Sequence, residues 1–193
     1  MQLLNRQWQV EGIEDAENRP RVAQDKISRV LTLNDFKETP PQHGVGLFLY
    51  RVAVNGPQRN CAARTDSKGM RFRASLPVDL QYLLVPWGLS VDSQLEILGW
   101  AMRTLEDSAI LPAGLLNSAA NDSKMFLPSE CVELIIDPLN MQDQTQLWQA
   151  LQQPWRVSVG YVARMVALDS RKTIGEAAPV RVRQFEHVSQ GGA

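Results

Sequence analysis

The stretch from Val45 to Val54, VGLFLYRVAV, constrains the fold more than any other part of this 193-residue chain. It begins as a nearly continuous apolar run, which is typical of a strand buried on both faces. Asn55-Gly56-Pro57 follows and favours a turn. A strand of this kind must be packed against other elements, and the rest of the chain has to supply them.

Other segments predict further strands and two helices around this strand. β-branched or alternating apolar residues predict strands over 27–33, 71–85, 131–136 and 155–168. Helical spacing of apolar residues predicts helices over 93–107 and 141–152. Residues 108–128 are rich in Pro, Gly, Asn and Ser, and we expect a long loop there. The order of elements predicts an α+β fold with a mixed, largely antiparallel sheet and helices packed on one face.

Local signals set the expected ends of the two helices. Ser93 with Glu96 three residues later predicts a capping box at the start of the first helix. Asn140 is a suitable N-cap for the second helix. Gly99 inside the first helix is unfavourable by up to about 1 kcal/mol relative to Ala, so we expect another backbone to approach there.

The chain divides into three parts on this basis. Residues 1–26 are polar and predict a short helix or loop segment, and residues 27–170 carry the predicted domain. Residues 171–193 contain VRVRQFEHV, which is strand-like but has few apolar residues to bury. We expect this tail to be an extended arm that pairs with something else.

Composition excludes several classes of protein. The formal net charge of −1 argues against binding nucleic acid through a broad basic surface. Cys61 and Cys131 are too few for a disulfide framework and lack the paired spacing of a metal site. No apolar run reaches the length of about 18 residues that a membrane span requires, and the N-terminus does not resemble a secretory signal. We expect the protein to be made in the cytoplasm.

The sequence offers little that could perform catalysis or hold a cofactor. The common phosphate-binding, zinc-binding and serine-hydrolase motifs are missing. Cys61 and His43 could in principle form a thiol-dependent hydrolase site, but no pattern positions the histidine. We therefore expect no enzymatic activity, no metal and no cofactor.

The sequence has more side chains of the kinds that commonly anchor protein interfaces than side chains typical of a catalytic site. Fifteen of the twenty basic residues are Arg, and several stand beside Trp or Tyr, as in Tyr50-Arg51 and Trp155-Arg156. Arg181 and Arg183 would share one strand face in the tail. These residues indicate contact with protein partners, although many of the aromatic rings could equally fill the core.

Four stretches carry a family pattern in a fixed order: LFLYRVAVNGPQRN (47–60), LPVDLQYLLVPWG (76–88), LEILGWAMRTLED (95–107) and IIDPLNMQDQTQLWQALQQPWRVSVGYVARMVALD (135–169). The first stretch contains Tyr-Arg-Val followed by Asn and Arg-Asn, in a predicted strand and the turn after it. The third contains Leu-Gly in a predicted helix. The fourth contains Leu-Trp in a predicted helix, followed by Arg-x-Ser-x-x-Tyr. Together they resemble the tail-terminator, or cap, proteins of phage-tail-like contractile injection systems of the antifeeding-prophage and virulence-cassette type. Gln81 stands where that family often has His, and Val78 where it usually has Leu.

The resemblance implies a structural cap. Such a protein forms a ring on the distal end of the inner tube and also engages the sheath. The resemblance implies a homo-hexamer, which copies the sixfold symmetry of the tube. It ends polymerisation of both and stabilises the particle, which is assembled in the bacterial cytoplasm. The alternative is another structural adaptor of the same particle, in the baseplate or linked to the tube. The expected interface residues are Arg51, Asn55, Arg59, Asn60, Arg156, Arg181 and Arg183.

Overall fold

The structure is a computed structural model that describes residues 4, 28–37, 43–59, 62–66, 68–119 and 125–175. Eight strands and four helices fall within these ranges. The strands are β1 (Ser28–Leu31), β2 (Gly44–Val54), β3 (Arg64–Thr65), β4 (Arg71–Phe72), β5 (Leu76–Trp87), β6 (Ile110–Pro112), β7 (Cys131–Ile136) and β8 (Val159–Leu168). The helices are α2 (Leu33–Lys37), α3 (Val91–Asp107), α4 (Ala113–Ala119) and α5 (Met141–Ala150).

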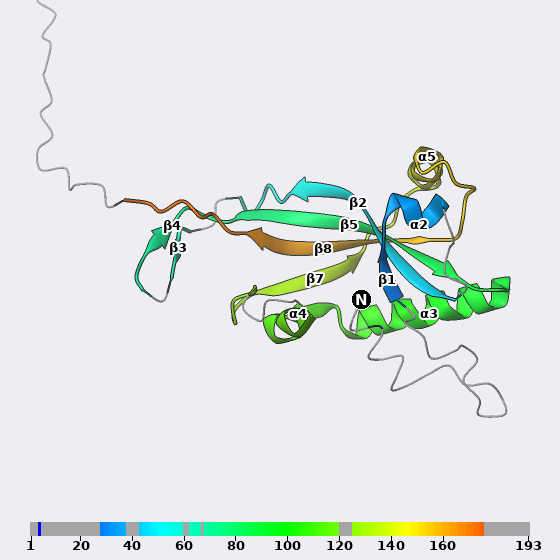
Figure 1. The fold of residues 1–193 in the computed structure, drawn as a ribbon, viewed down its shortest axis with the longest axis horizontal. Helices are drawn as coiled ribbons and strands as arrows, with labels where there is room; N and C mark the ends of the chain where they lie inside the picture. The colour runs from blue at the N-terminus through cyan, green and yellow to red at the C-terminus, as the bar shows by residue number, and fades with distance from the viewer. Residues whose placement is uncertain are drawn as a thin grey trace, which may run out of the picture.

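Six strands form one sheet in the order β1-β2-β5-β8-β7-β6, and β3 and β4 form a separate hairpin (Figure 1). Only the β1–β2 pair is parallel, and the other pairs in the sheet are antiparallel. The predicted mixed, largely antiparallel sheet of an α+β protein is therefore confirmed.

Helices cover both faces of this sheet, which corrects the expectation of helices on one face. Successive strand residues point to opposite faces, and Leu83 and Leu84 of β5 are both fully buried. Leu84 packs in a cluster with α3, whereas Leu83 packs in a cluster with α2 and α5. A strand that is apolar on both faces requires cover on both, and the short helices α2 and α5 supply the second layer.

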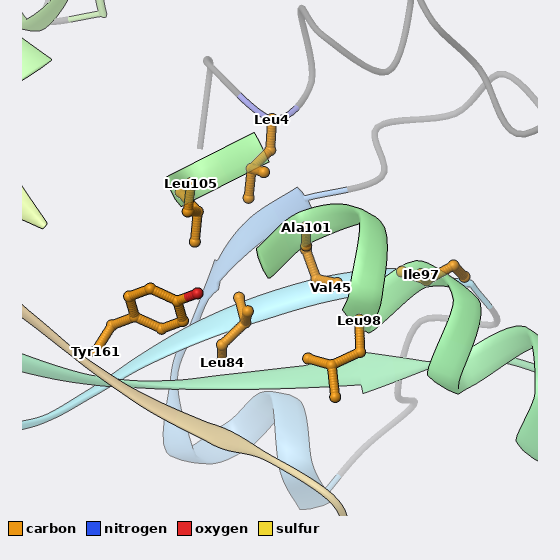
Figure 2. Packing of buried hydrophobic residues seen from close by; sticks show 8 residues of the cluster. All are labelled: Leu4, Val45, Leu84, Ile97, Leu98, Ala101, Leu105 and Tyr161. Atoms are coloured by element: carbon orange, nitrogen blue, oxygen red, sulfur yellow. The ribbon is translucent and has the colours of Figure 1, made fainter. Parts of the chain in front are cut away.

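The first core cluster lies between the sheet and α3. Ile97, Leu98, Ala101 and Leu105 of α3 pack against Val45, Leu84 and Tyr161 of three neighbouring strands, and Leu4 joins them (Figure 2). Leu4 is fully buried, so a residue from the N-terminal segment contributes to this core. Burying each such large apolar side chain stabilises the fold by about 1.5–3 kcal/mol.

The second core cluster lies on the other face and is rich in aromatic rings. Phe36 of α2 meets Phe48 of β2 and Trp148 of α5 in edge-to-face arrangements, with ring centroids 5.4 and 5.8 Å apart. Trp148 is 1% exposed, and its indole N–H donates to the Ser158 hydroxyl at 3.3 Å. This cluster fixes both α2 and α5 on the sheet.

The helix ends agree with the sequence at α5 and differ at α3. Asn140 caps α5, where its side-chain oxygen accepts from the Asp143 N–H at 2.8 Å, as predicted. The N-cap of α3 is Ser90, which accepts from the Ser93 N–H, so the prediction of Ser93 as the cap is wrong. Nothing lies within 4 Å of a Cβ built on Gly99, so the expected backbone approach is absent among the described residues.

Several element boundaries also differ from the sequence prediction. The strand expected over 27–33 ends at Leu31, and α2, which was not predicted, begins at Leu33. The expected loop over 108–128 contains β6 and α4. The strand expected over 71–85 is divided into β4 and β5, and the strand expected from residue 155 begins at Val159. The predicted segment 1–26, apart from Leu4, and the arm beyond residue 175 lie outside the described residues.

Candidate functional site

A bulge in β2 places two large polar side chains on the same face of the sheet. Leu49 pairs with Tyr82 and Arg51 pairs with Gln81, so Tyr50 is the extra residue between them. Because a bulge interrupts the alternation of side chains, Tyr50 and Arg51 both project toward α5. Tyr50 packs against the second core cluster at this point.

Tyr50, Arg51 and Gln81 form one wall of a cleft that we call the α5 groove. Its other wall is the loop between β7 and α5 together with one side of α5 itself. The groove has a volume of about 550 Å³ and is lined by Tyr50, Arg51, Gln81, Asp137, Pro138, Leu139, Asn140, Asp143, Gln146 and Leu147. The groove is therefore lined by both polar and apolar side chains.

Two polar atoms of this wall are buried without a partner among the described residues. They are the Tyr50 hydroxyl and the Gln81 side-chain oxygen. Burial raises the pKa of Tyr50, and the nearby Asp137 carboxylate raises it further. The phenol therefore stays neutral at physiological pH and can both donate and accept a hydrogen bond.

The acidic side of the groove is positioned by the start of α5 and by β8. The Asp143 carboxylate accepts from the Asn140 side-chain amide at 2.8 Å, which completes a reciprocal cap of the helix. The Asp137 N–H donates to the Gly160 carbonyl of β8 at 2.8 Å. These contacts hold the carboxylates of Asp137 and Asp143 at the groove. The Asp143 carboxylate already accepts a hydrogen bond from Asn140.

The predicted interface residues on β2 have different environments. Arg51 is exposed and lines the α5 groove. Asn55 is only 4% exposed, and its amide donates to both carboxylate oxygens of Asp79 at 3.1 and 3.2 Å. Its side-chain oxygen accepts from the Gln58 N–H at 3.2 Å. Asn55 therefore holds the turn after β2 within this chain.

The remaining predicted residues do not gather at one site. Arg59 is exposed in the turn after β2, and Arg156 is half-buried in the connection from α5 to β8. Asn60, Arg181 and Arg183 lie outside the described residues. Sequence reasoning missed Tyr50, Asp137 and Asp143 as groove residues, because no local signal marks the bulge that brings β2 to α5.

The described residues offer little for catalysis or metal binding. Within them, no group of three or more His, Cys, Asp or Glu side chains is arranged to hold a metal ion. His43 is half-buried at the start of β2, and Cys61 lies outside the described residues. None of the helices in the described part is long and apolar enough to cross a membrane.

Two solved structures share this fold. One is the sheath/tube terminator, in its extended state, of the extracellular contractile injection system PVC, with 17% identity and a TM-score of 0.58 over 89% of this chain and 59% of that one. The other is the tube-terminating cap of the anti-feeding prophage, with 16% identity and a TM-score of 0.53 over 79% of this chain and 52% of that one. This chain thus spans between half and three-fifths of the matched chains.

The sequence itself matches a family model. A search of curated proteins finds no match to the chain. The model of the Pvc16 N-terminal domain matches residues 2–182, which is nearly the whole sequence. The chain belongs to the Pvc16 N-terminal domain family.

Proposed function

We propose that this chain is a terminator of a contractile injection system, which caps the distal end of the inner tube and of the sheath. The observation that carries the proposal is the family match over residues 2–182, supported by a fold shared with a sheath/tube terminator over 89% of the chain. The role is structural rather than catalytic. The chain is assembled in the bacterial cytoplasm and remains part of the particle.

The physical logic of termination favours a closed ring. A tube built by head-to-tail contacts grows until its end is covered, because each added ring presents a new end. A cap must match the symmetry of the tube and present no further growing surface. We propose a homo-hexamer for this reason, with the inner tube protein and the sheath protein as partners.

The part of β2 that does not pair with β1 is consistent with a protein that functions in an assembly. β1 pairs only with Val45–Phe48, so the rest of β2 has one edge with no strand beside it among the described residues. Val52 and Val54 on this part are 56% and 51% exposed. An apolar strand edge of this kind favours pairing with another chain.

The expected interface residues remain part of the proposal, except Asn55, whose side chain is bonded to Asp79 and Gln58 of the same chain. Arg51, Arg59 and Arg156 are proposed to contact partners, as are Asn60, Arg181 and Arg183 in segments outside the described residues. We also propose that the arm, expected over residues 171–193, adds a strand to the sheath with its part beyond residue 175, because residues 172–174 pair with β4 of the same chain. Deleting residues 176–193 should then weaken sheath attachment while leaving the domain folded.

The test is electron microscopy of particles from a strain that lacks this chain. Loss of a cap should give tubes of abnormal length or unstable distal ends, whereas loss of a baseplate adaptor should abolish assembly. Complementation with the full chain should restore uniform lengths. Uniform, stable particles in the deletion strain would overturn the proposal.

A further inference from the structure

The α5 groove has the chemistry of a site for a cationic side chain. The Tyr50 hydroxyl and the Gln81 side-chain oxygen are buried without a partner among the described residues, and both can accept a hydrogen bond. Asp137 adds a carboxylate at the same opening. Leaving a buried polar atom without a partner is unfavourable, so a side-chain movement that opens these two atoms to the groove lets an occupant donate to them.

The groove also has an apolar side. Pro138, Leu139 and Leu147 line it together with the polar groups. An occupant that fits must therefore carry a cation beside an apolar side chain. Arg51 is exposed and also lines the groove, so the groove carries one guanidinium beside the carboxylates of Asp137 and Asp143.

The β3–β4 hairpin presents this combination at its tip. Residues 64–73 contain Arg64, Lys68, Arg71 and Arg73 but only one acid, Asp66. Lys68 and Met70 are both exposed at the tip, and Met70 is 51% exposed. A flexible methionine side chain adapts readily to an apolar wall.

Hydrogen bonds within the chain hold the described part of the hairpin in shape before it meets a partner. The Asp66 carboxylate accepts from the N–H groups of Lys68 and Met70 at 2.9 and 2.8 Å. The base of the hairpin is held by an ion pair between Arg64 and Asp169 and by the Arg73 N–H, which donates to the Lys172 carbonyl. A preorganised tip loses little conformational entropy on docking.

The hairpin and α5 lie toward opposite ends of the long axis of the molecule (Figure 1). The tip of one chain is therefore suited to reach the groove of a neighbouring chain rather than its own. Contacts between two different surfaces of identical chains form rings when the rotation closes.

We propose that the β3–β4 tip of one copy docks into the α5 groove of the next, where Lys68 donates to Asp137, Tyr50 and Gln81 and Met70 packs on Leu139 and Leu147. This inference rests on the proposed function, because it names the contact that closes the ring. It predicts a heterologous interface repeated between every pair of neighbours.

A cysteine pair tests the contact without altering the charged groups. Met70→Cys combined with Gln146→Cys should give an oxidation-dependent ladder of crosslinked chains in isolated particles, since Gln146 lines the groove and is exposed. The matched control is Met70→Cys with Glu106→Cys, because Glu106 is exposed on α3 at the other face. Each single variant measures the background from Cys61 and Cys131. An absent ladder, or an equal one in the control, overturns the proposal.

A charge exchange tests the chemistry. Lys68→Glu or Asp137→Lys alone, added to the cysteine pair, should lower the crosslink yield roughly tenfold or more, because each change places like charges together. The two combined should restore most of the yield, and Lys68→Arg should retain it. If the combination is no better than either single variant, the proposed pairing is wrong.

A third variant separates docking from folding. Tyr50→Phe should lower the crosslink yield and leave the thermal stability of the isolated chain equal or higher, because it removes an unpartnered hydroxyl. A lower stability with an unchanged yield would assign Tyr50 a purely structural role. If tube lengths are controlled but the cysteine pair does not crosslink, the contact fails while the proposed function stands. If the pair crosslinks but lengths are uncontrolled, the proposed function fails instead.

Discussion

The Asp137 N–H donates to the Gly160 carbonyl at 2.8 Å, and the Asp137 carbonyl oxygen lies over Gly160 so closely that a side chain there would collide with it. This pair joins the loop before α5 to the first residues of β8. It therefore sets the position of the Asp137 carboxylate at the α5 groove. Glycine at residue 160 is required by the close approach of two backbones.

Gly160→Ala should destabilise the isolated chain by about 1–3 kcal/mol, because the added methyl group forces the Asp137 loop away from β8. Urea unfolding followed by circular dichroism measures the loss. Gly99→Ala is the matched control, since no atom of the described residues lies within 4 Å of a Cβ built at that position on α3. It should instead stabilise the chain by up to about 1 kcal/mol. Equal effects at the two glycines would contradict this account of the loop.

Trp148 and Trp155 should differ sharply on truncation. Trp148 is buried between α5 and the sheet, whereas Trp155 is 48% exposed. Trp148→Ala should cost about 3–5 kcal/mol, because it opens a cavity in the aromatic cluster. Trp155→Ala should cost clearly less in the same urea experiment. A larger loss of unfolding free energy for Trp155→Ala than for Trp148→Ala would contradict the position of Trp148 in the second core cluster.

Asn55→Asp should destabilise the chain more than Asn55→Ala does. The substitution removes the amide donors to Asp79 and sets two carboxylates together, with an expected loss of roughly 1.5–3 kcal/mol at neutral pH. Asn55→Ala is the control without the added charge. Weaker assembly with unchanged stability would mean that Asn55 acts mainly at an interface.

Alkaline pH should unfold the chain through its tyrosines. Burial is the main cause that raises the pKa of Tyr50, Tyr82 and Tyr161, which are the three tyrosines of the sequence. The folded state keeps these phenols protonated while the unfolded chain ionises near pH 10. Their contribution to stability is therefore complete below about pH 10 and is lost as the pH rises further. Tyrosinate absorbance should appear together with unfolding. Three phenols that ionise near pH 10 in a folded chain would contradict this burial.

The sequence predicted the elements whose signals are local. The apolar run of β2 and the Asn140 cap of α5 depend on neighbouring residues alone, and both appear where expected. The cap of α3 was misplaced by one turn because Ser90 and Ser93 are both suitable residues. The helix α4 was missed since residues 108–128 carry many residues that favour loops.

The arrangement of layers and the groove depend on contacts between distant residues. The adjacent buried residues Leu83 and Leu84 require cover on both faces, but they do not reveal that α2 and α5 provide it. The bulge at Tyr50 is a mismatch of register between β2 and β5. Neither strand carries that information alone, so the groove could not be predicted from the pattern of residues.

Electron cryomicroscopy of the distal end of intact particles tests the central proposal most directly. The account predicts density for this fold as one closed ring of six copies beyond the last rings of tube and sheath, with the hairpin of each copy against the α5 groove of the next. Density for this chain at the baseplate, or repeated along the tube, would contradict the proposal that the chain is a terminator.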